Sequence, residues 1–179
     1  SFRLDDDFCP VDSEVVRAMK NAVSKLRDTG ASVDMNARPD RVTFKRSHEA
    51  YEIILGADMG SVKGLEYTKW FHAQLRRNFI KNRWKDFFER YDVLLCPVAP
   101  MTAFEHDHGP RSKRMLTING ESRNYWQAGT RWAGLIILAD LPSTVVPVGV
   151  DSSAMPIGIQ IVGAHWQDLQ TIEVGRLFE

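Results

Sequence analysis

The sequence contains little cysteine, no excess charge of either sign and no long apolar run. Its 179 residues include two cysteines, Cys9 and Cys96, and 23 basic residues balance 23 acidic ones. Two distant cysteines do not form a disulfide framework, and a nucleic-acid-binding protein usually shows a basic excess. No apolar stretch reaches the roughly 20 residues of a membrane-spanning helix. We therefore expect neither nucleic acid nor membrane as a partner.

The start of the sequence also lacks a secretory signal. Residues 5–7 are three aspartates, and no basic region followed by an apolar one is present. This start resembles the middle of a longer protein, whose upstream part could carry targeting information. We expect a cytoplasmic location, with Cys96 as a reduced residue of the core.

Apolar residues at regular spacing are what the sequence does contain, within a composition that is 44% hydrophobic. Spacing near 3.6 residues predicts helices, over residues 11–30, 47–59, 66–90 and 125–138, and from Asp168 onward. Short apolar runs predict strands, over residues 31–37, 93–96, 143–150 and 157–163. The last two strands are predicted to form a hairpin. The sequence therefore predicts a single unit of the α/β class, covering residues 1–179.

Residues 66–90 form the clearest predicted helix. Large apolar side chains recur along it at roughly helical spacing: Phe71, Leu75, Phe79, Trp84, Phe87 and Phe88. Basic residues lie between them, which would suit a nucleic acid. Because the apolar period is kept and the chain is neutral, we favour a core stripe backed by a solvated basic face.

Residues 101–123 show no stable period. Gly109-Pro110 and Asn119-Gly120 are turn signals within this stretch. The sequence predicts a long irregular loop here, and such loops in compact domains are often functional.

Four stretches, in a fixed order, resemble the amidase-signature family. They are residues 91–104 (YDVLLCPVAPMTAF), 132–135 (WAGL), 141–149 (LPSTVVPVG) and 155–163 (MPIGIQIVG). The opening helix also resembles the one that begins the C-terminal half of that fold. The resemblance spans nearly the whole chain and rests on the ordered set rather than on any one motif.

This resemblance implies an α/β fold that is the C-terminal half of the amidase-signature fold, a mixed sheet flanked by helices. In the family, one serine attacks a carboxamide carbonyl, a second serine relays the proton and a lysine acts as base, the Ser-cis-Ser-Lys mechanism. Those residues belong to the N-terminal catalytic half, which is absent from residues 1–179. The resemblance therefore implies an amidase as the full-length protein, with no catalytic residue and no activity in this chain alone.

The resemblance also implies the partners and the pocket. No cofactor is expected, and the expected partners are a small-molecule amide substrate and the missing N-terminal half. The apolar strands of an incomplete sheet add a second copy of the chain as a possible partner.

By position in the family, the substrate-binding candidates are Met101, Thr102, Phe104, Trp132 and Ile136. Met101 and Thr102 stand where a strand enters a loop, the usual place for ligands in α/β sheets. Trp132 and Ile136 have an equally good interpretation as core residues of a helix. The apolar set favours an aryl or alkyl amide.

One motif departs from the family. Many members carry Asn-Leu-x-Gly-Leu-Pro before the last strand pair, where residues 137–142 read ILADLP. The tyrosine-leucine-serine-aspartate segment of transamidosome amidase subunits is also missing. These departures disfavour a subunit of a tRNA-dependent amidotransferase and favour a free-standing amidase. A non-catalytic binding or scaffold module of the same fold stays open as an alternative.

Other combinations that suggest chemistry are weaker. Ser152-Ser153 and Ser112-Lys113 lack the glycine-rich surroundings and the second serine of the family's site, so we expect structural roles for them. The stretch 104–108 (FEHDH) packs four potential metal ligands closely, but no further histidine or cysteine cluster completes a set. We expect hydrogen bonding within the loop and no metal.

Overall fold

A three-stranded antiparallel sheet forms the centre of the molecule. The computed structural model describes residues 1, 6–61 and 63–178. The strands β1 (Leu94–Pro97), β4 (Ser143–Val150) and β5 (Pro156–Val162) follow the order β1-β5-β4. The predicted α/β class and the hairpin of the last two strands are confirmed.

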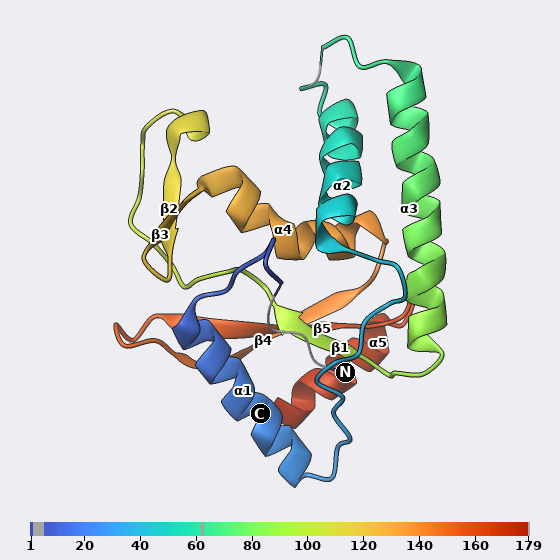
Figure 1. Cartoon of the computed structure of the whole chain (residues 1–179). Coiled ribbons are helices and arrows are strands. Elements are labelled where there is room, and N and C mark those ends of the chain that lie inside the picture. The colour runs from blue at the N-terminus through green and yellow to red at the C-terminus, as the bar shows by residue number, and fades with distance from the viewer. Residues whose placement is uncertain (2–5, 62, 179) are drawn as a thin grey trace.

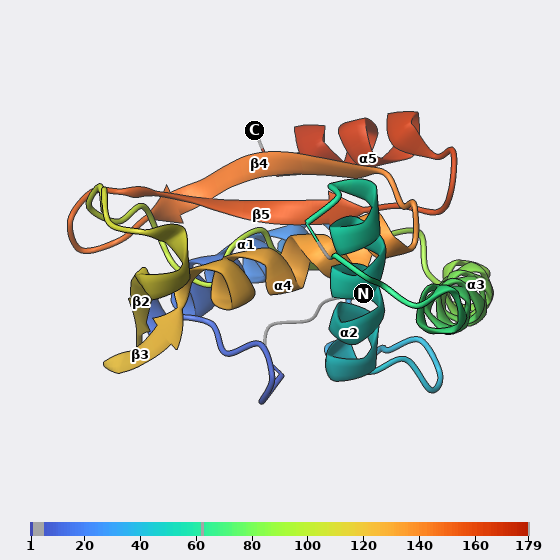
Figure 2. The same cartoon turned by 90° about the horizontal axis from the view of Figure 1, so that it is seen from above.

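Helices lie on both sides of this sheet (Figures 1 and 2). α1 (Ser13–Asp28) and α5 (Asp168–Gly175) lie below it in Figure 1, and α4 (Tyr125–Leu138) lies above it. α2 (Phe44–Asp58) and α3 (Tyr67–Phe88) form a hairpin that rises from the sheet beside α4. Of the helices in the described residues, none combines the length and the apolar character needed to cross a membrane.

The middle strand, β5, carries the most deeply buried part of the core. Ile159, Ile161 and Val162 are fully buried, as expected for a strand paired on both edges and covered on both faces. β4 is an edge strand, and Pro147 can lie opposite Gly158 because an edge strand tolerates a residue without an N–H.

The helix ends follow local chemistry that the sequence shows. The Asp12 carboxylate accepts from the Glu14 amide at the start of α1, and Gly30 takes the left-handed conformation (φ 96°) just beyond its end. α2 begins at Phe44, three residues earlier than predicted. Its cap is Thr43, whose hydroxyl accepts from the Arg46 amide.

The strand predicted over residues 31–37 is wrong, because this segment has no strand beside it to pair with. It is held by other contacts. The Arg27 guanidinium donates to the Val33 carbonyl at 2.8 Å, and the Tyr91 hydroxyl donates to Asp34 at 2.6 Å.

The irregular loop predicted over residues 101–123 is only partly right. A short helical turn, η1 (Arg111–Lys113), precedes a hairpin of β2 (Met115–Ile118) and β3 (Glu121–Asn124). Asn119 and Gly120 join the two strands with φ of 51° and 79°. Two positive φ values in a two-residue loop are what an Asn-Gly hairpin turn requires.

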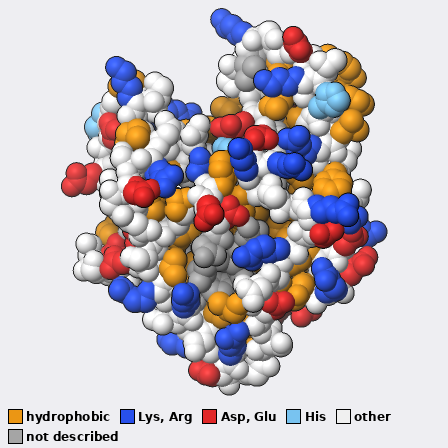
Figure 3. All heavy atoms as spheres, viewed as in Figure 1, with side chains coloured by type: hydrophobic (Ala, Val, Ile, Leu, Met, Phe, Trp, Pro, Cys, Tyr) orange, Lys and Arg blue, Asp and Glu red, His pale blue; other side chains and the backbone are white. Residues whose placement is uncertain are grey.

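The predicted core stripe of α3 is correct for only half of the helix. Trp84 and Phe87 are buried, but Phe71, Leu75 and Phe79 are 44%, 49% and 42% exposed. Figure 3 shows hydrophobic side chains gathered along this upper part of α3. The upper part of α3 projects beyond the sheet and α4, so only α2 packs against it there and leaves these three side chains exposed.

Candidate functional site

A cavity of about 680 Å³ opens between α2, the first turn of α4 and η1. Figure 3 shows the molecule hollowed here, between the α2–α3 hairpin and the β2–β3 hairpin. Leu55, Met59 and Trp126 provide apolar walls. Side chains with polar groups complete the lining, among them Glu52, Arg111, Ser112, Asn124 and Gln127. An apolar hollow with a few polar groups is the usual form of a small-molecule site.

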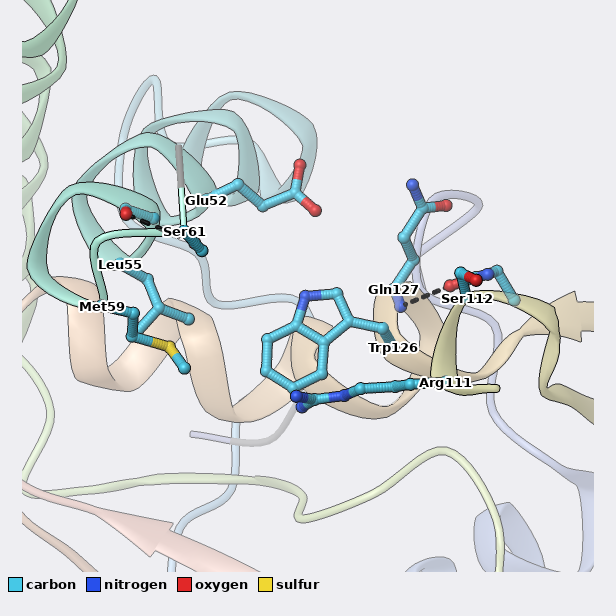
Figure 4. Close-up of a pocket in the computed structure, with 10 residues that line it drawn as sticks. Glu52, Leu55, Met59, Ser61, Arg111, Ser112, Trp126 and Gln127 are labelled. Atoms are coloured by element: carbon cyan, nitrogen blue, oxygen red, sulfur yellow. Dashed lines mark hydrogen bonds between the residues drawn. The ribbon is translucent and has the colours of Figure 1, made fainter. Parts of the chain in front are cut away.

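Local sequence places the right-hand wall of Figure 4. Asn124 caps α4, because its side-chain oxygen accepts from the Gln127 amide at 3.2 Å. Trp126 therefore stands in the first helical turn and faces the hollow. Pro110 precedes η1, and the short turn brings Arg111 beneath the Trp126 ring.

Arg111 and Trp126 form the closest cation–ring contact that the structure records. The guanidinium carbon lies 3.8 Å from the ring centroid. The other recorded pairs range from 4.0 Å, for Arg131 over Phe8, to 5.8 Å. Such a contact contributes about 0.5–1 kcal/mol at an exposed site.

The opposite side of the cavity carries a carboxylate next to a buried histidine. Glu52 Oε1 lies 3.3 Å from His48 Nε2, one helical turn earlier on α2. His48 is 5% exposed and packs against the rings of Phe8 and Tyr51. Burial lowers the pKa of His48, Glu52 acts in the opposite direction and Arg131 adds to the lowering. His48 is therefore neutral near pH 7 and lies beside the Glu52 carboxylate at the cavity.

The structure places two of the five predicted substrate residues near the start of α4. Phe104 meets the Tyr125 ring edge-on at 5.8 Å, and Met101 packs, like Tyr125, against the small cluster of Leu116, Ile118 and Ala128. The Thr102 hydroxyl donates to Asp151 in the turn of the β4–β5 hairpin at 2.6 Å. This bond is the largest cause that lowers the Asp151 pKa. None of these residues lines the cavity itself, although Tyr125 precedes Trp126.

Trp132 and Ile136 lie elsewhere, in the core. They are 1% and 3% exposed, and Trp132 meets Phe44 edge-on at 4.7 Å. The structure gives both a packing role under α2 and does not bring them together with Met101, Thr102 and Phe104. Contact of any of these five residues with a substrate stays a prediction.

The serine pairs occupy turns. The Ser152 hydroxyl donates to Glu14 at 3.3 Å, which ties the β4–β5 turn to α1. Ser112 belongs to η1 and lines the cavity. In the part of the chain that the structure describes, no three His, Cys, Asp or Glu side chains are arranged to hold a metal ion.

Sequence reasoning missed the residues that line the cavity. The pattern predicts helices over residues 47–59 and 125–138, which contain Leu55 and Trp126, and an irregular loop that contains Arg111, but it does not bring these segments together. The one available signal was Asn124, a good helix cap directly before Tyr125 and Trp126, which places these rings at a helix start beside a loop.

The fold is that of amidase-signature proteins. A bacterial aryl acylamidase of the amidase signature family superposes with a TM-score of 0.73 at 19% identity, covering 99% of this chain and 42% of its own. A glutamyl-tRNA(Gln) amidotransferase subunit from Thermotoga maritima gives 0.76 at 19% identity, covering 99% and 41%. At this identity the likeness concerns the fold.

Sequence comparison identifies the family. The amidase family model matches residues 55–172. A chloroplastic/mitochondrial glutamyl-tRNA(Gln) amidotransferase subunit of Oryza sativa subsp. indica is 30% identical over 135 residues, which are 74% of this chain and 23% of that protein. This chain belongs to the amidase family. It spans under a quarter of that curated relative and under half of the two solved structures.

Proposed function

We propose that this chain forms the substrate-pocket part of a larger amidase that hydrolyses carboxamide C–N bonds. Membership of the amidase family over residues 55–172 carries this proposal. The nucleophilic serine, the relay serine and the lysine base would lie in an N-terminal half outside these 179 residues. The cavity between α2 and α4 would hold the non-reacting part of the amide, with Met101, Thr102 and Phe104 at its border.

Open surfaces on the described chain support a missing partner half. Among the described residues no strand lies on the outer edge of β4, and Val145 of β4 and Leu169 of α5 are 51% and 77% exposed. Unpaired strand edges and exposed apolar side chains are typical of surfaces that another segment covers.

The decisive experiment compares the whole encoded protein with the 179-residue chain. Both are tested on aryl and alkyl amides, with and without a serine-directed phosphonate. We expect phosphonate-sensitive hydrolysis by the whole protein and none by the chain. Serine-dependent turnover by the chain alone would contradict the proposal. A folded whole protein that binds amides without hydrolysing them would favour a binding or scaffold module instead.

A second candidate is the amidase subunit of a tRNA-dependent amidotransferase. The sequence relatives that are named as glutamyl-tRNA(Gln) amidotransferase subunits favour it, whereas the Asp140 that replaces the family's glycine disfavours it. Its test is ammonia release from glutamine by the whole protein. Stimulation of that release by glutamyl-tRNA would support this candidate, and its absence with active anilide hydrolysis would exclude it.

A further inference from the structure

Arg111 is a cation at a cavity without an acidic partner. Some other basic side chains of the described chain have one: Arg77 and Lys81 share Asp140, and Arg76 pairs with Glu49. No carboxylate in the described residues lies within ion-pair distance of Arg111, and its recorded contact is the Trp126 ring. A guanidinium at a cavity wall with its charge uncompensated is suited to an anion from outside the chain.

The ring contact prepares Arg111 for a planar anion. The guanidinium carbon lies over the Trp126 ring, 3.8 Å from its centroid, and no hydrogen bond from the Arg111 N–H groups to the described residues is recorded, so these groups are available to a ligand. Two parallel N–H groups match the two oxygens of a carboxylate, which a lysine cannot do. Contact with the ring also restricts the Arg111 side chain before binding, so that less conformational entropy is lost when the anion binds.

The other residues of the cavity indicate which kind of molecule bears the anionic group. The first turn of α4, with its positive end, lies on the same side as Arg111. Leu55 and the 59%-exposed Met59 face it across the hollow and offer an apolar surface. Glu52 stands on the α2 side, so a negative group is repelled there and attracted toward Arg111. The ligand that fits has an apolar body and a carboxylate at one end.

We propose that this cavity takes amide substrates whose non-reacting end carries a carboxylate, which Arg111 binds through two N–H groups while contact with the Trp126 ring restricts the arginine side chain. This inference rests on the proposed amidase function only where it identifies the ligand as a substrate. The anion site itself rests on the cavity and on Arg111.

Binding tests the site without any turnover. The whole encoded protein is titrated by calorimetry with 4-phenylbutanoate and with 4-phenylbutan-1-ol, which differ in the terminal charge. The Arg111→Gln variant should bind the carboxylate about tenfold more weakly, the effect of about 1.4 kcal/mol, while the alcohol is unaffected. Arg111→Lys should bind the carboxylate with an affinity between those of the parent protein and of Arg111→Gln. Lys113→Gln is the matched control, since it removes a neighbouring exposed charge outside the cavity lining.

Kinetics tests the substrate class. The anilide of pentanoic acid is compared with the monoanilide of glutaric acid, which has nearly the same length and an added carboxylate. We expect a higher kcat/KM for the charged anilide and an about tenfold loss of this advantage in Arg111→Gln. Equal kcat/KM for the two anilides would overturn the proposal, even if Arg111→Gln relieved inhibition by the product.

The two proposals fail in different ways. Equal binding of the acid and the alcohol, or equal effects of Arg111→Gln and Lys113→Gln, would overturn the carboxylate site even in an active amidase. Arg111-dependent carboxylate binding by a protein that hydrolyses no amide would support the site and overturn the amidase function.

Discussion

The base and the tip of the α2–α3 hairpin carry the same kinds of side chains in opposite surroundings. At the base, Trp84 and Phe87 of α3 pack with Phe44 of α2 in the main core and are almost fully buried. At the tip, Tyr67 and Phe71 stack on each other at 6.0 Å and remain 72% and 44% exposed. Apolar periodicity thus identifies the side chains that share a face, but what covers that face depends on how far the helix extends beyond its neighbours.

The largest expected effect is the loss of an aromatic ring at the base. Trp84 is 1% exposed and lies 5.3 Å from the Phe87 ring and 5.7 Å from the Phe88 ring. We expect Trp84→Ala to lower the free energy of unfolding by about 3–5 kcal/mol, since the ring leaves a cavity. Urea denaturation measures the change. A loss below about 1 kcal/mol would mean that the base is no better packed than the tip.

Asp140, in the segment before β4, forms ion pairs with the middle of α3. Removal of its charge should have a smaller effect on stability than removal of the Trp84 ring. The Asp140 carboxylate binds Arg77 and lies 2.7 Å from Lys81. The residue has φ of 54°, a value that glycine and asparagine adopt with the least strain. Asp140→Asn keeps that backbone tolerance and removes the charge. We expect a loss of about 1 kcal/mol in urea denaturation, because these side chains are partly exposed.

This loss should depend on pH. Burial raises the Asp140 pKa, but hydrogen bonds from Lys81 and Arg77 outweigh burial and hold it below its ordinary value of 3.8. The contribution of the ion pairs is therefore complete above that value and disappears as the pH falls through the lower value of the folded protein. A difference between Asp140→Asn and the parent that persists under strongly acidic conditions would contradict this account.

His48 should make the stability of the base of the α2–α3 hairpin sensitive to mildly acidic pH. Burial is the main cause that lowers its pKa below the ordinary 6.5, Glu52 and Glu49 oppose it and Arg131 adds to it. The unfolded chain then takes up the proton at a higher pH than the folded chain. Stability should therefore decline as the pH falls from 6.5 through the folded-state value. His48→Gln should flatten this decline between pH 7.5 and 5, and an unchanged slope in urea titrations would assign the decline to other groups.

The smallest expected effect belongs to the tip. Leu75 is 49% exposed, so Leu75→Ser should change the free energy of unfolding by no more than about 0.5 kcal/mol. The same urea titration as for Trp84→Ala provides the comparison. A loss of 2 kcal/mol or more in the whole encoded protein would show that another segment covers the tip.

Much of the fold was accessible from the sequence because it depends on local signals. The apolar spacing of residues 11–30 and 66–90 and the two apolar runs of the last hairpin predicted elements that the structure confirms. The strand predicted over residues 31–37 failed for a tertiary reason. An extended segment becomes a strand only when another strand lies beside it.

The candidate site was less accessible. Trp132 and Trp126 stand on the same helix six residues apart, and the Asn124 cap, which places Trp126 at the helix start, is the one local signal that distinguishes them. Only the packing of α4 under α2 buries Trp132 and leaves Trp126 at the cavity.

By itself, the sequence determined most of the element types, the turn chemistry and the family, since these depend on side-chain period, on backbone tolerance at single residues and on ordered motifs. The tertiary structure alone decided which half of α3 is buried and which residues meet at the cavity. Arg111, Trp126 and Leu55 come from three separate segments. Their proximity follows from how the helices pack around the sheet, and local residue patterns do not record that packing.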